Sequence, residues 1–259
     1  MNADRSLVVV LTCARPAGAP DYLPETLAAL DNEGALGAWQ KHVICDGPAL
    51  AGHFPGWRIH ATESRRGTRE AHWRAFWLAA ALGAERLVFF EDDVQPCRNA
   101  VKWLLEVTIP NNVCAVLPHD FKEVPEGAVP GLYARPANGL YSRGMWGCQA
   151  LVLPARTVYY LVGRDPRARA TDRPESVDRA LGIELDCSPW PHVAICAPSL
   201  ADHVGEASTG TSARLHRTRN FAGRQFDATS LSFSLDDSQN LDLPCPVCYT
   251  RQAEEGRRR

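Results

Sequence analysis

The sequence has no apolar run of the roughly 20 residues that a membrane-spanning helix needs. The nearest run, "FWLAAALGAERLVFF", is interrupted by Glu85 and Arg86. The first ten residues, "MNADRSLVVV", lack the basic start, the long apolar core and the small-residue cleavage site of a signal peptide. We therefore expect a soluble, cytoplasmic protein with no membrane partner.

An excess of charge of one sign is also missing. The 259 residues carry a formal net charge of −2, so no overall field favours binding to nucleic acid or to a membrane surface. Lysine is nearly absent, with only Lys41, Lys102 and Lys122 among 28 basic residues. A GC-rich coding sequence accounts for such a bias, although arginine also suits bidentate contacts to phosphate.

Paired cysteine motifs are scarce. The nine cysteines are odd in number, and several lie in apolar runs such as "HVICDG" and "VAICAP". In a cytoplasmic chain these are expected to be buried free thiols. Cys245 and Cys248 have the spacing of zinc ligands, but no second cysteine pair accompanies them. A structural zinc, a disulfide and a free thiol pair are all compatible with this spacing.

Strand-like and helix-like segments alternate over residues 1–205. The predicted strands are "SLVVVLTC", "KHVICD", "WRIHAT", "RLVFFE", "VCAVLP", "CQALVLP" and "PHVAICAP". The predicted helices are "LPETLAALDNEG", "TREAHWRAFWLAAAL", "NAVKWLLEVT", "ARTVYYLVG" and "RPESVDRALGIEL". This alternation predicts an α/β fold with a mostly parallel central sheet, helices on both faces and a ligand site at the carboxyl ends of the strands.

Two stretches lack this pattern. Residues 119–147 are rich in Gly, Pro and aromatic residues and are expected to be irregular. After about residue 205 the chain turns polar. We therefore expect residues 206–259 to form a partly ordered C-terminal extension that ends in an irregular tail.

Three consecutive acids, Glu91, Asp92 and Asp93, stand where the strand "RLVFFE" ends. On a continuing strand, Glu91 and Asp93 would share one side and Asp92 would face the other. Carboxylates that converge beside a buried strand suit Mg²⁺ or Mn²⁺, and such a cation would offset the repulsion among the acids. The competing interpretation is an acidic turn that caps the following helix.

The motif "FFEDDV" resembles the Asp-x-Asp-type signature of GT-A-fold glycosyltransferases, in its Glu-Asp-Asp form. The segments "VVVLTCARP", "ICDG", "RRGTREAHWRAFWLA" and "HVGEAS" follow in the order of that fold, over about residues 6–210. The stretch "ADHVGEAST" also loosely resembles a His-Val-Gly-x-x-Ser segment of N-acetylglucosaminyltransferase IV-like enzymes. The resemblance implies that residues 1–205 form one GT-A-like catalytic domain that uses Mn²⁺ or Mg²⁺ and a nucleotide-diphosphate sugar, with UDP as the commonest nucleotide.

The resemblance also implies roles for individual residues. Asp93, Glu91 and His203 would ligate the metal, and Glu91 and Asp92 would also lie near the nucleotide or the transferred sugar. The other implied contacts to the nucleotide sugar are Thr12, Arg15, Asp46, Arg66, Gly67, His72, Arg74 and Gly147. An ordinary solvated helix face is the alternative for "SRRGTREAHWRA", in which Thr68 is the predicted N-cap.

The catalytic base implied by the resemblance is Asp178, with Glu175 as its rival. In an inverting hexosyltransferase, this residue would take a proton from the acceptor hydroxyl. The alternative for Asp178 is an acid that only stabilises a helix N-terminus.

The acceptor is not indicated, and a glycan, a protein, a small molecule and a hydroxymethylated DNA base are all compatible with the sequence. The arginines of "ARLHRTRN" and "EEGRRR" suit a phosphate backbone, but equally a solvated tail, so nucleic acid is the less favoured partner. A nucleotidyltransferase is the alternative enzyme, although "CARPAGAPDY" lacks the dense Gly-rich loop that activated-sugar synthesis would need. A catalytically inactive nucleotide-sugar-binding module is the non-enzymatic alternative.

Overall fold

A computed structural model describes residues 5–15, 17–31, 36–37, 40–48, 54–119, 131–136, 148–164, 177–190, 192–205 and 221–231. Gly147, Glu175, Cys245 and Cys248 lie outside these ranges, so the predictions for them stay predictions. Among the described residues, no helix has the length and apolar character needed to cross a membrane.

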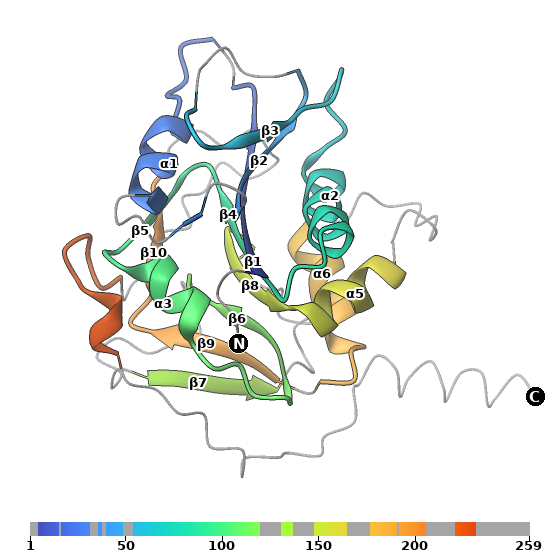
Figure 1. The fold of residues 1–259 in the computed structure, drawn as a ribbon, viewed down its shortest axis with the longest axis vertical. Coiled ribbons are helices and arrows are strands. Elements are labelled where there is room, and N and C mark those ends of the chain that lie inside the picture. Colours follow the sequence, from blue (N-terminus) through green and yellow to red (C-terminus); the bar gives the residue numbers. More distant parts are fainter. Residues whose placement is uncertain are drawn as a thin grey trace, which may run out of the picture.

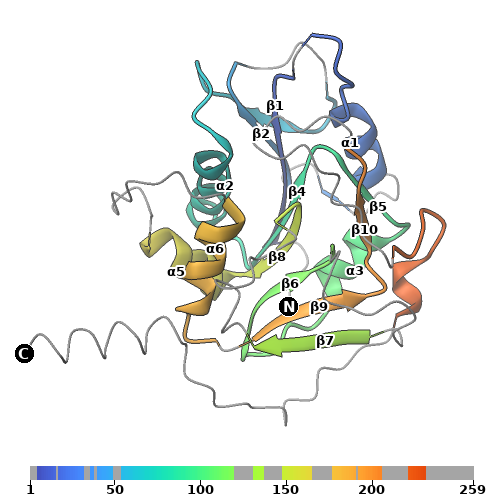
Figure 2. The same ribbon diagram turned by 180° about the vertical axis from the view of Figure 1, so that it is seen from behind.

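A central sheet of eight strands has the order β3-β2-β1-β4-β8-β6-β9-β7 (Figures 1 and 2). Its strands are β1 (Ser6–Cys13), β2 (Lys41–Asp46), β3 (Arg58–His60), β4 (Arg86–Glu91), β6 (Val113–Leu117), β7 (Gly131–Pro136), β8 (Ala150–Pro154) and β9 (His192–Ala197). Strands β7 and β8 run antiparallel to their neighbours, and the other six share one direction. The predicted α/β fold with a mostly parallel sheet is confirmed.

Helices cover both faces of this sheet, as predicted. Figure 1 shows α2 (Thr68–Ala81), α5 (Ala155–Gly163) and α6 (Val177–Asp186) on one side, and α1 (Leu23–Asp31) and α3 (Ala100–Glu106) on the other. Alternate residues of β1 pack into two separate cores. Leu7, Val9 and Leu11 pack with α2, α5 and α6, whereas Val8 and Val10 pack with α1 and α3. Burial on both faces explains why the first strand is a continuous apolar run.

The structure differs from the prediction within residues 119–147. Strand β7 lies inside this stretch and pairs antiparallel with β9 at the edge of the sheet. An edge strand has only one neighbour, so it tolerates the Gly and Pro at its two ends, which had favoured an irregular segment.

A second, two-stranded sheet joins β5 (Val94–Pro96) to β10 (Ala201–His203). The pairing is antiparallel, with Val94 opposite His203. These strands are too short for an alternating pattern to reveal them in the sequence. The pairing matters for function because it brings the segment of His203 beside the acidic motif.

Part of the C-terminal extension packs on the domain. Ser199 forms a bridge with Phe221, and Arg98 forms one with Asp227. Ala228, at the start of a short 3₁₀ helix, is fully buried. The boundary predicted at residue 205 stays a prediction.

Candidate metal and nucleotide site

The acidic motif lies at the edge of the sheet where parallel strands end. Strands β1 and β2 run parallel to β4, so Thr12 and Asp46 reach the same edge. Strand β4 ends at Glu91, and Asp92 and Asp93 form the turn into β5. The turn, rather than strand alternation, therefore directs the side chains of Asp92 and Asp93. It nevertheless groups Glu91 with Asp93, as the sequence predicted.

Glu91, Asp93 and His203 can hold a metal ion. One ligand atom from each of the three lies within 4.8 Å of the others. The backbone N–H of Val204 donates to the carbonyl oxygen of Asp93 at 2.8 Å, and His203 Nε2 lies 3.3 Å from Asp93 Oδ2.

The surroundings of the Asp93 carboxylate show whether this cluster suits a divalent cation. Its side chain is only 9% exposed, and among the described residues Oδ1 is buried with no hydrogen-bond partner. A buried carboxylate oxygen without a partner is unfavourable, and a cation would supply one. Two carboxylates and an imidazole suit Mn²⁺, and the carboxylates also suit Mg²⁺. The residues present therefore fit such an ion.

Gly205 is a further part of this cluster that the sequence interpretation did not single out. A Cβ atom at this position would overlap Asp93 Oδ2 and would lie 2.8 Å from Asp93 Cγ. The segment after β10 therefore needs glycine here so that its backbone can approach the buried carboxylate. The glycine of "HVGEAS" was the available signal, but the sequence does not show which side chain it faces.

Arg15 and Thr12 contact the acidic motif directly. Arg15 Nη2 lies 2.6 Å from Asp92 Oδ1 and 3.1 Å from Asp93 Oδ2. Thr12 Oγ1 donates to Asp92 Oδ2 at 2.6 Å, and Thr26 Oγ1 donates to the Asp92 carbonyl oxygen at 2.5 Å. The protein thus offsets part of the repulsion among the acids with its own guanidinium. Contact of Arg15, Thr12 and Asp92 with a nucleotide sugar stays a prediction.

The three acids differ in how readily they carry charge. Burial, together with the charges of Asp93 and Asp178, raises the pKa of Glu91 well above its usual value. Burial also raises the pKa of Asp92 to about 6, although Arg15 opposes this shift. Burial acts in the same direction on Asp93, but the hydrogen bond and charge of His203 and the charge of Arg15 lower its pKa overall. Asp93 is therefore the acid of the motif that most readily stays ionised.

Asp46 orders the loop that leads into α2. Its carboxylate accepts the backbone N–H of Arg66 at 2.7 Å and of Gly67 at 3.0 Å. The prediction of Thr68 as N-cap is wrong: the cap is Gly67, at φ +97°, and Thr68 is the first helical residue. A positive φ favours glycine at this turn. Direct contacts of Asp46, Arg66 and Gly67 with a nucleotide stay predictions.

His72 and Arg74, on α2, make their observed contacts within the protein. His72 is fully buried, with Nδ1 2.8 Å from the Thr68 carbonyl oxygen and Nε2 3.9 Å from Glu91 Oε1. Burial lowers the pKa of His72 to about 4, so the ring is neutral at pH 7. Arg74 Nη1 donates to the Cys45 carbonyl oxygen at 3.4 Å. Their predicted contacts with a nucleotide are not tested by this geometry.

Asp178 lies in the first turn of α6, close enough to raise the pKa of Glu91. Its Oδ1 is buried and has no hydrogen-bond partner among the described residues. Burial raises the pKa of Asp178, against an opposing effect of hydrogen bonds from Cys148. The candidate base therefore stands near the candidate metal ligands, although its catalytic role stays a prediction.

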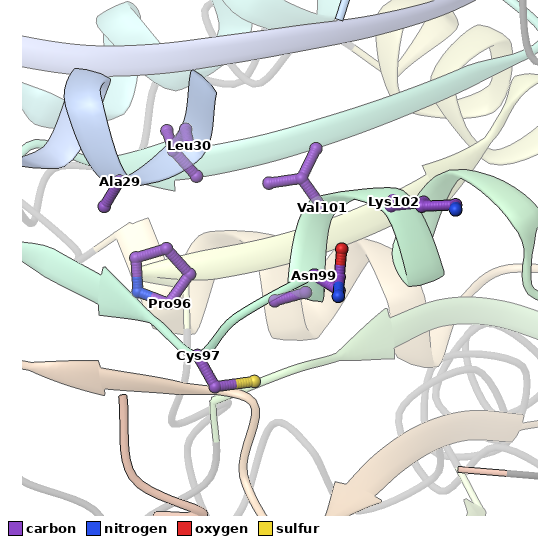
Figure 3. Close-up of a pocket in the computed structure, with 8 residues that line it drawn as sticks. Ala29, Leu30, Pro96, Cys97, Asn99, Val101 and Lys102 are labelled. Atoms are coloured by element: carbon purple, nitrogen blue, oxygen red, sulfur yellow. The ribbon is translucent and has the colours of Figure 1, made fainter. Parts of the chain in front are cut away.

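A separate small hollow lies between α1 and the start of α3. Figure 3 shows four of the residues that line this hollow: Leu30 on one side, and Pro96, Cys97 and Val101 on the others. None of the predicted site residues lines it, and with room for only about 10 Å³ it is far smaller than the roughly 300–1,000 Å³ of typical small-molecule pockets. We therefore do not place the donor there.

No protein-family model and no curated protein matches the chain. The solved structures that match include a glycosyltransferase involved in the glycosylation of the major capsid of PBCV-1, at 11% identity and a TM-score of 0.33, covering 63% of this chain and 68% of that one. GalNAc-T7 with UDP, GalNAc and Mn²⁺ matches at 13% identity and a TM-score of 0.48, covering 96% of this chain and 48% of that one. Mannose-1-phosphate geranyltransferase from Thermus thermophilus matches at 16% identity and a TM-score of 0.45, covering 78% of this chain and 76% of that one.

The chain thus spans about half the length of the GalNAc-T7 structure. At these identities and TM-scores, a function has to be inferred from the residues of the site themselves.

Proposed function

We propose that this protein is a metal-dependent glycosyltransferase that moves a sugar from a nucleotide-diphosphate donor, with UDP as the first choice, to an acceptor hydroxyl. One observation carries the proposal. Glu91 and Asp93, at the end of β4 and in the turn that follows it, meet His203 of the distant β10 at the carboxyl edge of the parallel strands, and a buried oxygen of Asp93 has no partner among the described residues. Open α/β sheets bind their ligands at this edge.

The chain supplies several groups that suit a diphosphate donor. Mn²⁺ or Mg²⁺ held by Glu91, Asp93 and His203 would supply positive charge for the diphosphate leaving group. The N-terminus of α2 lies at the same edge, and the positive end of a helix dipole favours phosphate. Asp46 holds the entrance of that helix in place through the backbone N–H groups of Arg66 and Gly67.

Asp178 is the proposed general base of an inverting transfer. It would take the proton of the acceptor hydroxyl as that oxygen bonds to the anomeric carbon and the bond from this carbon to the diphosphate breaks. The raised pKa of the half-buried Asp178 supports this role, because it makes the carboxylate a stronger base than an exposed aspartate. Its position beside Glu91 would put it next to the donor.

Thermal unfolding with nucleotides tests the donor. A ligand at 100 times its Kd stabilises the folded state by about 2.7 kcal/mol, so UDP with Mn²⁺ should raise the melting temperature by several degrees. UDP without metal should raise it much less, and Asp93→Asn should abolish the metal-dependent part. If no nucleoside diphosphate shifts the melting temperature of the wild type, with or without Mn²⁺, the proposal is wrong.

Product analysis separates the transferase from its alternatives. A glycosyltransferase incubated with a UDP-sugar and Mn²⁺ releases UDP, by transfer or by slow hydrolysis. A nucleotidyltransferase releases pyrophosphate from a nucleoside triphosphate and a sugar 1-phosphate instead. An inactive binding module is stabilised by the nucleotide sugar but releases neither product.

A further inference from the structure

The guanidinium of Arg15 pairs with two carboxylates of the acidic motif. Its side chain is only 8% exposed and extends from beyond the end of β1 to both Asp92 and Asp93. Its guanidinium carbon lies 4.7 Å from the centre of the Tyr22 ring, a cation–π arrangement. Asp93 Oδ2 faces Arg15 Nη2 at 3.1 Å and His203 Nε2 at 3.3 Å. The carboxylate of Asp93 is therefore already paired with a permanent cation.

A metal ion on Asp93 and a guanidinium on the same carboxylate would repel each other. Arginine cannot shed its charge in a protein, so the repulsion can be relieved only by movement. Arg15 lies 2.6 Å from Asp92 but 3.1 Å from Asp93, so the contact with Asp93 is the longer of the two. Moving a mostly buried guanidinium away from an anion is costly unless another anion replaces it. A diphosphate is such an anion, and its oxygens match the fork of N–H donors of arginine.

We propose that Arg15 is the resident counter-ion of the metal-free motif, and that it transfers from Asp93 to the diphosphate when metal and nucleotide bind together. This inference rests on the proposed function. Arg15 weakens the binding of metal alone, because its guanidinium must move away from Asp93 and gains no other anion in exchange. With diphosphate present, Arg15 gains that partner while Asp92 still holds it at the site. Arg15 therefore couples the two ligands, and each increases the affinity for the other.

Calorimetric titration of Mn²⁺ tests this role without any measurement of transfer. The Mn²⁺ affinity is measured with and without saturating UDP for the wild type and for Arg15→Met. Coupling between two sites typically amounts to about 5- to 150-fold in affinity. We expect Arg15→Met to bind Mn²⁺ alone several-fold more tightly than the wild type does. We also expect the factor by which UDP increases the Mn²⁺ affinity to be at least about fivefold smaller in Arg15→Met than in the wild type.

Two further variants complete the design. Arg98→Met is the matched control, because Arg98 also pairs with an aspartate, Asp227 at 3.0 Å, but outside the acidic motif. Its loss should change neither the Mn²⁺ affinity nor the coupling. Arg15→Lys keeps the charge but loses the planar fork, so its coupling should fall between those of the wild type and Arg15→Met. If Arg15→Met does not fold, Arg15→Lys is compared with the wild type in its place.

Three results would overturn the inference. If Arg15→Met tightens Mn²⁺ binding equally with and without UDP, Arg15 is only a neighbouring charge. If it leaves the binding of Mn²⁺ alone unchanged and weakens UDP, Arg15 contacts the nucleotide but does not compete with the metal. If the wild type binds neither ligand, the proposed function fails first and this inference with it, which distinguishes that failure from the other two.

Discussion

Replacement of Gly205 by alanine should damage the metal site while it leaves the fold intact. The new Cβ would overlap Asp93 Oδ2 and lie 2.8 Å from Cγ and 3.0 Å from Cβ of the same residue. Real Cβ contacts are almost never this short, so either the carboxylate or the backbone segment must move. The backbone is held by the hydrogen bond from Val204 N–H to the Asp93 carbonyl oxygen. The carboxylate of Asp93 should therefore be the group that is displaced.

The expected size of the effect follows from this overlap. Overpacking a filled site costs about 1–3 kcal/mol, which lowers the melting temperature by about 2–12 °C for a chain of this size. The Mn²⁺ affinity should fall by at least the roughly 10- to 100-fold seen when groups that only support metal ligands are removed, because here a ligand itself moves. Calorimetry of Mn²⁺ with UDP and thermal unfolding followed by circular dichroism measure the two effects.

Gly163→Ala provides the matched control. Gly163 ends α5, and a Cβ there meets nothing within 4 Å. This variant should keep the wild-type metal affinity and a melting temperature within about 2 °C of the wild type, as expected for a small surface substitution. If Gly205→Ala behaves like Gly163→Ala in both measurements, the close approach to Asp93 is refuted.

Three other substitutions probe separate parts of the site. Asp93→Asn keeps the side-chain volume but weakens a metal ligand, so the Mn²⁺-dependent rise in melting temperature with UDP should disappear; an unchanged rise would remove Asp93 from the metal site. Asp178→Asn should keep the affinity for Mn²⁺ and UDP within about twofold, but slow transfer by the roughly 10²- to 10⁴-fold that general-base catalysis contributes; a normal rate would assign the base to another residue. Because the pKa of His72 is lowered from 6.5 to about 4, the unfolded state gains a proton that the folded state lacks as the pH falls through this window. Wild-type stability should then drop there by up to about 3 kcal/mol relative to His72→Asn, as urea unfolding at several pH values would show; a difference that does not change with pH would contradict a buried neutral ring.

The parts of the fold that the sequence predicted are those with strong local patterns. The first strand is a continuous apolar run because both of its faces are covered, and α2 buries residues at helical spacing from Ala71 to Ala79. Strands β5 and β10 have three residues each, too few for any period to appear. Their pairing connects segments far apart in the chain, so only the folded structure shows that His203 reaches the acidic motif.

The sequence predicted the grouping of the acidic residues, but not the contacts that they make. The end of a strand identified Glu91, Asp92 and Asp93, and parallel strands place their ends together. The expected contact of Arg15 with a nucleotide stays a prediction, and its pairing with Asp92 and Asp93 was not foreseen. Guanidinium binds phosphate and carboxylate with the same geometry, so residue type alone does not choose between these partners. The choice depends on distances across neighbouring strand ends, which the sequence does not contain.

The most direct test of the whole account is a crystal structure of the protein with Mn²⁺ and UDP, measured with X-rays near the manganese absorption edge. We expect one anomalous peak enclosed by Glu91, Asp93 and His203, with diphosphate oxygens completing its coordination. A structure that contains bound UDP but places manganese elsewhere, or shows no manganese near these three side chains, would contradict the metal-dependent mechanism.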